Sequence, residues 1–187
     1  DAQESRGLGD VYKRQVLKQV FEQRQQSLAR SEQIHDGQIE VESFAAHHYL
    51  LTPMPVEDNP MRNMQQIMQH LQSAWEHSSY KAGCGSYISL EKALQGQFDV
   101  YDGVFTPVDP QDDDSLFLLR PAGQYLCGYS VGSWDKLPEL YSHMIAYAKK
   151  HHLALTGNCY EIGLNEFAIS RPEEYVARVS ILIDPKQ

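Results

Sequence analysis

The 187-residue sequence has few cysteines and no long apolar run, and both shortages narrow the kind of protein that it can encode. Its three cysteines are an odd number without CxxC spacing, so neither a disulfide framework nor a zinc site is indicated. No run of about 18 apolar residues is present to span a bilayer, and no basic, apolar leader opens the chain. We therefore expect a soluble, cytoplasmic protein with reduced thiols that makes no membrane contact.

Clustered basic residues are also missing. The 16 Lys and Arg are outnumbered by 25 Asp and Glu, which gives a formal net charge of −9. Because affinity for nucleic-acid phosphates comes chiefly from clustered Lys and Arg, this chain is not expected to bind DNA itself. An acidic protein instead attracts cations.

The usual signatures of catalysis and of metal binding are absent from the sequence. It contains no GxSxG elbow, no glycine-rich phosphate loop and no Cys with a His at a suggestive spacing. Neither the adjacent histidines at 47–48 and 151–152 nor His70 and His77, two helical turns apart, suit one metal ion. We therefore expect no metal, no cofactor and no enzymatic activity.

The N-terminal part divides into two segments. Residues 1–15 have no hydrophobic period and resemble translated adaptor sequence, so we expect them to be non-native or disordered, with the natural protein beginning upstream of Val16. Residues 16–36 are predicted to form a linker or dimerisation helix, because Leu17, Phe21 and Leu28 recur on a helical period before Gly37. Such an apolar stripe packs either on its own domain or on a partner helix, and both alternatives are open.

Residues 38–184 alternate strand and helix patterns in an order that occurs twice. Before an acidic linker at 109–114, the patterns predict strands at 38–53, a helix at 60–79, and strands at 86–90 and 98–108. After the linker, they predict strands within 116–131, a helix at 136–151, and strands at 156–164 and 175–183. The prediction is an α+β domain of two βαββ repeats, 38–108 and 115–184, with pseudo-twofold symmetry, an antiparallel sheet and two main helices.

A residue-by-residue comparison supports the repeat. At a constant offset of 76 positions, identical residues meet in three places: Ala46 and Ala122, Tyr49 and Tyr125, and Leu50 and Leu126. A domain built in this way leaves a groove where its halves meet, and small ligands tend to bind in such grooves.

Glu161 is the residue in this predicted groove with the clearest chemical role. Strand alternation places Tyr160, Ile162 and Leu164 on one face and Glu161 on the other. A carboxylate held among aromatic rings has a raised pKa unless a positive partner keeps it ionised, and a lipophilic cation is such a partner. The alternative is an ordinary solvated glutamate on a strand.

Aromatic residues are plentiful, with 11 Tyr and two Trp. Several fall on or beside predicted strands, where cation–π contacts could form a cage: Tyr49, Tyr87, Tyr101, Tyr129, Trp134 and Tyr175. The alternative is that these rings simply fill the core, because aromatic residues suit strands.

An ordered set of short motifs resembles the GyrI-like small-molecule-binding domain. The motifs are Arg120-Pro121-Ala122-Gly123-Gln124-Tyr125, Gly132-Ser133-Trp134-Asp135-Lys136-Leu137, Tyr160-Glu161 and Glu173-Glu174-Tyr175. The resemblance covers about 38–184 and is strongest in the second half. Members of this family occur alone, as gyrase inhibitors or small binding proteins, and fused to the DNA-binding domains of MerR-type or AraC-type regulators.

The resemblance implies a ligand-sensing domain for amphipathic cationic or aromatic compounds. It gives Glu161 the role of engaging a lipophilic cation, with Trp134 and Tyr175 as ring contacts, although Trp134 stands where a tyrosine is more usual. Tyr49, and more weakly the acids Glu57 and Asp58, come near the groove only through the repeat. Tyr87 and Tyr129 are further candidate ligand contacts.

The segment ahead of the domain adds expectations about partners. The helix at 16–34 resembles the dimerising coil of MerR-type multidrug regulators, which implies a homodimer and DNA binding only through a missing N-terminal domain. Two other functions stay open: a stand-alone protein that inhibits gyrase or sequesters a toxin and, less favoured, a small-molecule hydrolase with Glu161 as general base.

Overall fold

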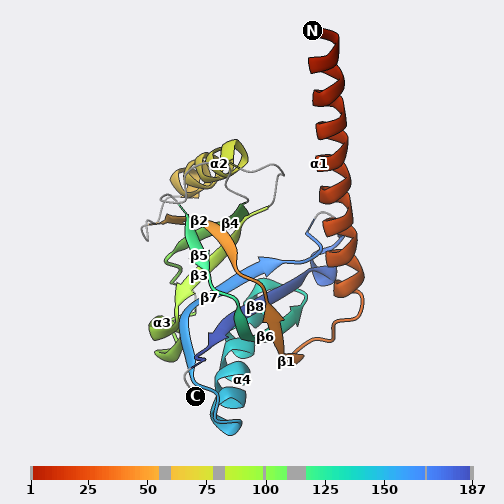
Figure 1. Ribbon diagram of the computed structural model, residues 1–187. Helices are drawn as coiled ribbons and strands as arrows, with labels where there is room; N and C mark the ends of the chain where they lie inside the picture. Colours follow the sequence, from red (N-terminus) through yellow and green to blue (C-terminus); the bar gives the residue numbers. More distant parts are fainter. Residues whose placement is uncertain are drawn as a thin grey trace.

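The computed structural model in Figure 1 shows a long N-terminal helix that is followed in the chain by an α+β domain. The structure describes residues 2–54, 60–77, 83–98, 100–108, 117–166 and 168–185. Its helices are α1 (Ala2–Ser31), α2 (Pro60–His77), α3 (Leu90–Leu94) and α4 (Leu137–Lys150), with the 3-10 helices η2 (Trp134–Lys136) and η3 (Pro172–Glu174). Its strands are β1 (Ile39–Phe44), β2 (His47–Pro53), β3 (Gly85–Ser89), β4 (Gly103–Val108), β5 (Leu118–Arg120), β6 (Gly123–Val131), β7 (Leu155–Gly163) and β8 (Val176–Ile183). The predicted α+β class is confirmed.

One antiparallel sheet joins the eight strands in the order β1-β6-β8-β7-β3-β4-β2-β5. Each strand of the first half has a counterpart in the second: β1 and β5, β2 and β6, β3 and β7, β4 and β8. If the two members of each pair are exchanged, the same strand order results, read from the other end. The ladders follow the same rule, since Glu42 pairs with Tyr125 and Leu118 pairs with Tyr49. This arrangement is what two units related by a twofold axis between β3 and β7 would give, and the duplication of the sequence itself stays a prediction.

Two segments differ from the predicted elements. Residues 98–102 were expected to begin a strand, yet they form a loop ahead of β4 in their described part, and α3 is not among the predicted helices. Ser89 caps α3 by accepting a hydrogen bond from the backbone of Lys92, and a helix this short has no hydrophobic period to reveal it. The ammonium of Lys92 then pairs with Asp102 at 2.5 Å, which fixes the loop. The predicted linker at 109–114 lies outside the described residues.

Helix α4 packs on one face of the sheet, which we call the helix face. Its buried residues Leu140 and Met144 lie over Gly128 of β6, where a Cβ atom would stand 2.4 Å from the sulfur of Met144. Gly128 therefore lets the helix approach the strand closely. Ile88 and Val179, from β3 and β8, belong to the same buried cluster.

Helix α2 also covers the helix face. Among the apolar residues that repeat along it, Met61, Met64, Met68 and Trp75 are exposed, whereas Leu71 is half-buried. His70 is buried, because its ring nitrogens hydrogen-bond Thr52 and Thr106 at 2.7 and 2.9 Å. Helical periodicity does not encode these polar contacts with the sheet.

The opposite face of the sheet, which we call the aromatic face, is strongly curved. Arg120 of β5, at one end of the strand order, lies over the rings of Phe44 and Tyr125 near the other end, 4.8 and 4.9 Å from their centroids. It also donates a hydrogen bond of 3.0 Å to the carbonyl of Ala45. One buried guanidinium thus draws the two ends of the sheet together.

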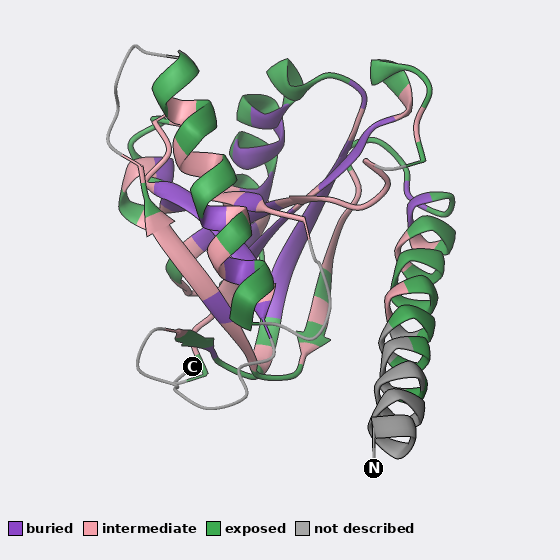
Figure 2. Ribbon diagram, turned by 90° about the horizontal axis from the view of Figure 1, so that it is seen from above, coloured by how far each residue is buried: buried purple, intermediate pink, exposed green. Residues whose placement is uncertain are grey.

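Helix α1 begins before the predicted start at Val16. Residues 2–15, expected to be non-native or disordered, belong to this helix although they include Gly7 and Gly9 and have no apolar period, and the prediction of its start relied on such a period. The helix ends at Ser31, after which Ile34 is buried and Gly37, with a φ of 75°, turns the chain into β1. In Figure 2 the described residues of α1 are mostly exposed, and the helix meets the domain near its C-terminal end.

The buried His70 predicts a loss of stability in acid. Burial lowers its pKa from 6.5 to about 4, so the unfolded chain takes up a proton more readily than the folded one as the pH falls below 6.5. Between pH 7 and pH 4.5 this should remove roughly 2 kcal/mol of unfolding free energy. Urea titrations of the wild type and His70→Gln should show a difference in stability that shrinks by that amount on acidification. A difference that does not change with pH would contradict the assignment.

Candidate functional site

Glu161 lies in β7 on the helix face, in the central part of the sheet. Tyr160 and Ile162 pack with the aromatic cluster of the opposite face, whereas Cys159 packs beneath α4, so the predicted alternation is confirmed. The residue is 1% exposed, which excludes the solvated alternative. A buried carboxylate requires partners that compensate for its lost water.

Two phenols supply those partners. The hydroxyl of Tyr141, from α4, donates a hydrogen bond to Oε1 of Glu161 at 2.6 Å, and that of Tyr101 donates to Oε2 at 2.9 Å. Tyr101 belongs to the loop that Lys92 and Asp102 fix, so both predicted halves of the domain contribute. Burial raises the pKa of Glu161 to about 7, and the two hydrogen bonds oppose that rise. The carboxyl group can therefore change its charge near neutral pH.

Further rings surround this acid. Phe98 stacks on Tyr141 with 5.1 Å between the ring centroids. Tyr175 fills the space above Gly163, where a Cβ atom would lie 2.6 Å from its hydroxyl oxygen. Because Gly163 is two residues beyond Glu161 on the same strand, the phenol of Tyr175 stands on the helix face next to the acid.

Trp134 forms the outermost ring of the site. It stacks on Tyr175 at 5.0 Å between centroids and is 53% exposed. A cavity of about 290 Å³ opens beside the two rings and includes Ile169, Arg171 and Pro172 in its lining. Trp134 and Tyr175, which the family resemblance names as ring contacts, thus lie side by side, with Tyr175 beside Glu161, and their part in ligand binding stays a prediction. We call these three residues, with Phe98, Tyr101 and Tyr141, the Glu161 site.

Three predicted site residues lie elsewhere. Tyr49 and Tyr87 pack with Phe105 and Tyr160 on the aromatic face, and Tyr129 belongs to another cluster on that face. The sheet therefore separates them from Glu161. The ladder that pairs Tyr87 with Tyr160 explains the placement of Tyr87, since paired residues share a face. Glu57 and Asp58 lie outside the described residues.

Tyr141 and Phe98 are the contributors that sequence reasoning did not select. Tyr141 lies on the buried side of α4 with Leu137, Leu140 and Met144, so helical periodicity shows that it points inward. Periodicity does not show that its hydroxyl meets an acid. Phe98 lies in a loop, where local sequence carries no comparable signal.

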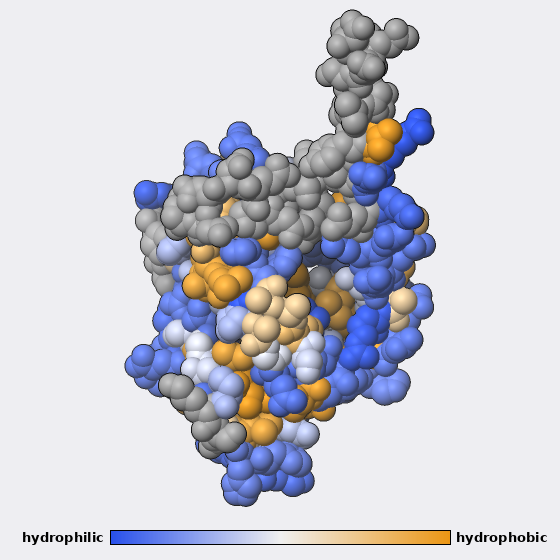
Figure 3. Space-filling view, viewed as in Figure 1, coloured by the Kyte–Doolittle hydropathy of each residue, from blue (hydrophilic) through white to orange (hydrophobic). Residues whose placement is uncertain are grey.

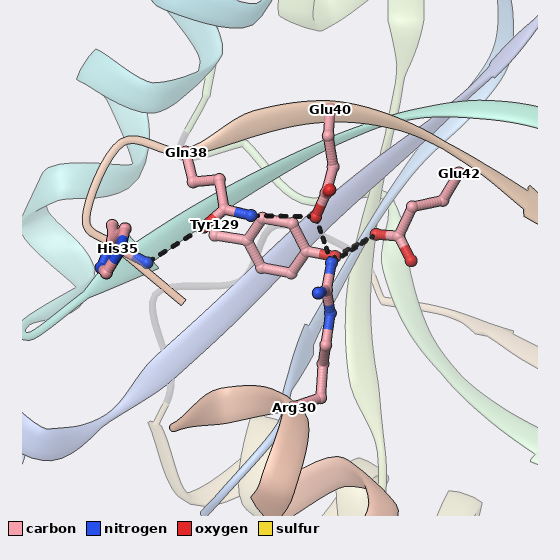
Figure 4. Close-up of polar contacts among 6 residues, drawn as sticks. All are labelled: Arg30, His35, Gln38, Glu40, Glu42 and Tyr129. Atoms are coloured by element: carbon pink, nitrogen blue, oxygen red, sulfur yellow. Dashed lines mark hydrogen bonds and ion pairs between the residues drawn. The ribbon is translucent and has the colours of Figure 1, made fainter. Parts of the chain in front are cut away.

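Tyr129 takes part in the attachment of α1, which Figure 4 shows. Its hydroxyl donates a hydrogen bond to Glu42, and Arg30 of α1 forms ion pairs with Glu40 and Glu42. Gln38 adds a hydrogen bond of 3.1 Å to Glu40. This network, which we call the Arg30 network, joins the end of α1 to β1 and β6.

Among the described residues, no group of three or more His, Cys, Asp or Glu side chains could hold a metal ion. No helix in the described ranges is long and apolar enough to cross a membrane.

An acid buried among rings in an α+β fold, beside an open cavity, defines a small-molecule-binding domain. More particularly, the chain belongs to the GyrI-like small-molecule-binding domain family, whose model matches residues 46–184. The family expected from the sequence motifs is therefore confirmed. A search of curated proteins finds no match for the chain.

Solved structures share this fold at low sequence identity. A cryo-EM structure of an EcmrR–DNA complex is 12% identical, with a TM-score of 0.56 over 98% of this chain and 69% of that one. The crystal structure of the EcmrR C-terminal domain is also 12% identical, with a TM-score of 0.56 over 79% of this chain and 98% of that domain. An uncharacterised conserved protein from Listeria innocua is 13% identical, with a TM-score of 0.52 over 83% of this chain and 96% of that protein.

The raised pKa of Glu161 predicts a stability that falls as the pH rises. The folded protein holds the proton up to about pH 7, whereas the unfolded chain releases it near 4.5. Raising the pH from 5 to 8 should therefore cost the wild type about 2 kcal/mol relative to Glu161→Gln, which carries no charge. Glu139→Gln, at a side chain that is 75% exposed, is the matched control and should show no such trend. Parallel pH profiles for the wild type and Glu161→Gln would refute the prediction.

Proposed function

We propose that the chain is the effector-binding domain of a bacterial transcription regulator, which binds amphipathic cationic or aromatic small molecules at the Glu161 site. The observation that carries this proposal is the buried carboxylate of Glu161, held by two phenols with further rings beside it. A lipophilic cation would satisfy both parts of such a site, since the carboxylate supplies the opposite charge and the rings supply cation–π and apolar contacts.

Access to Glu161 requires rings to move, because the acid is 1% exposed. Trp134 and Tyr175 stand between the acid and the 290 Å³ cavity, so a ligand would enter by displacing or intercalating these stacked rings. The ligand then selects a conformation in which the carboxylate is open. Such a change is the kind of differential binding that a sensor requires.

Binding accounts for the site better than catalysis does. In the described part of the chain, the side chains that hydrogen-bond Glu161 are the phenols of Tyr101 and Tyr141. Burial and the nearby acid raise the pKa of Tyr141 well above its usual value, so this group keeps its proton and holds the carboxylate in place. A general base would instead need room for a water molecule beside it.

The regulator role draws on the fold shared with EcmrR, whose structure contains DNA. We propose that DNA contact belongs to a separate domain of the intact protein, in keeping with the net charge of −9. The protein would act in the cytoplasm, where such regulators meet DNA.

A dye-binding comparison tests the role of Glu161. Rhodamine 6G, a lipophilic cation, should bind Glu161→Gln at least tenfold more weakly than the wild type, since a charge-assisted contact contributes roughly 1.5–3 kcal/mol. A neutral dye of similar shape should bind both proteins almost equally. Fluorescence anisotropy at pH 8 measures both affinities, and equal losses for the two dyes would remove the charge role. Turnover of an activated ester that Glu161→Gln abolishes would favour hydrolysis instead.

The same site predicts that cation binding depends on pH. A cation pairs with the ionised form of Glu161, whose pKa is about 7. Affinity for rhodamine 6G should therefore rise about tenfold between pH 6 and pH 8, as the ionised fraction of the free protein rises. At the Glu161 site the dependence should vanish in Glu161→Gln, while Glu139→Gln should retain it. A flat profile in the wild type would contradict this assignment.

We also propose that α1 pairs with the helix of a second chain. Val11 and Leu17 are exposed on the part of α1 that extends away from the domain, which leaves room for a partner helix. Sedimentation equilibrium should show a dimer that Leu17→Glu weakens, whereas Gln25→Glu on the same helix should leave it intact. A monomer at all concentrations would contradict this pairing.

A further inference from the structure

A second and larger cavity lies between α1 and the end of β7, with a volume of about 510 Å³. In Figure 3 the surface is hollowed at this place, between α1 on the right and the rest of the domain. The volume lies within the range of about 300–1,000 Å³ that is usual for small-molecule pockets. Apolar side chains of α1 line one wall and apolar side chains of the sheet line the other: Val20, Phe21 and Leu28, facing Pro107, Ile162 and Leu164.

Only two of the described residues that line this cavity carry a formal charge, Glu166 and Arg24. Burial raises the pKa of Glu166, and the positive charge of Arg24 opposes that rise. Glu166 follows β7, whereas Arg24 belongs to an exposed part of α1. The cavity therefore contains the partly desolvated carboxylate of Glu166, with the positive charge of Arg24 on the opposite wall. A bound cation could replace Arg24 as the positive charge that stabilises this carboxylate.

The wall formed by α1 exposes apolar side chains to this space. Phe21 is 63% exposed and Leu28 is 37% exposed, although both line the cavity. A ligand with apolar groups would cover these two side chains and the facing Ile162 and Leu164. The hydrophobic effect thus favours a ligand with apolar groups, and the charge of Glu166 favours a ligand with a positive charge. An amphipathic cation has both properties.

This cavity is separate from the Glu161 site. Ile162 and Leu164 belong to clusters on the aromatic face, whereas Glu161 points to the helix face. Gly163 connects the two sites, since it lines the cavity and has the phenol of Tyr175 packed against it. Burial raises the pKa of Tyr175, and the charges of Glu166 and Glu161 add to that rise, so both acids lie within electrostatic reach of this ring.

We infer that the 510 Å³ cavity is a second binding site for a lipophilic cation, in which Glu166 supplies the opposite charge and Phe21 of α1 supplies the ring contact. The inference shares its ligand class with the proposed function but not its residues. A ligand bound there contacts α1 and the sheet at once. Its binding therefore stabilises the position of α1 against the domain, since it contacts both walls only while the helix is docked.

Dye binding to the full chain tests the second site. Equilibrium dialysis with rhodamine 6G should give two dyes per chain. Glu166→Gln should weaken one of them about tenfold and leave the other unchanged, whereas Glu161→Gln should have the reverse effect. Phe21→Ala should weaken the same dye as Glu166→Gln by several fold. Gln26→Ala is the matched control, because Gln26 is exposed on the same helix and does not line the cavity.

A fluorescence measurement locates the dye independently of affinity. Phe21→Trp places an indole in the cavity wall, and its emission maximum should shift to shorter wavelength when bound rhodamine 6G covers it. Gln26→Trp, outside the cavity, should show no such shift, with both variants measured in the Glu161→Gln background. Circular dichroism checks that each variant is folded.

The outcomes separate the two proposals. A single dye per chain that is lost in Glu161→Gln, with Glu166→Gln and Phe21→Ala binding like the wild type, overturns the second site and leaves the proposed function intact. Loss only in Glu166→Gln and Phe21→Ala would support the second site and refute the role of Glu161. If the folded wild type binds no cationic dye at all, both proposals fail.

Discussion

The carboxylate of Glu161 is buried, and a buried carboxylate needs hydrogen-bond donors, which the packing of both halves of the domain supplies. Its two hydrogen bonds come from a helix in one half of the domain and a loop in the other, so the site exists only when both halves are in place. The loop in turn depends on the pairing of Lys92 with Asp102. The burial of Glu161 is thereby linked to the packing of both halves of the fold. A ligand that displaces Tyr101 or Tyr141 from the carboxylate would therefore also disturb that packing.

The sheet divides the molecule into two environments. Its helix face carries α2, α4 and the Glu161 site, while its aromatic face holds the rings around Arg120 and the attachment of α1. Tyr175 packs against Gly163, and its phenol lies within electrostatic reach of both Glu161 and Glu166. The Arg30 network fixes the end of α1 to β1 and β6, so a movement of those strands would reach the helix directly.

The family resemblance suggested Trp134 and Tyr175 as ring contacts, whereas local patterns predicted the order of the main elements and the face of Glu161, because strand and helix periods depend on neighbouring residues. They misplaced Tyr49, Tyr87 and Tyr129 relative to Glu161, since which strands become neighbours is decided by long-range pairing. They did not reveal that His70 is buried, because its hydrogen bonds with Thr52 and Thr106 join residues far apart in the sequence. The phenols of Tyr101 and Tyr141 meet their acid only in three dimensions, beyond the reach of any local pattern.

The way the sheet ends has a consequence for the behaviour of the protein in a crowded cell. At one end stands β5, a strand of only three residues, and at the other stands β1, whose glutamates are engaged by Arg30. Short, charged and curved edges are poor templates for a strand from another molecule. The domain is thus protected from edge-to-edge aggregation without an additional segment that covers the edges of its sheet.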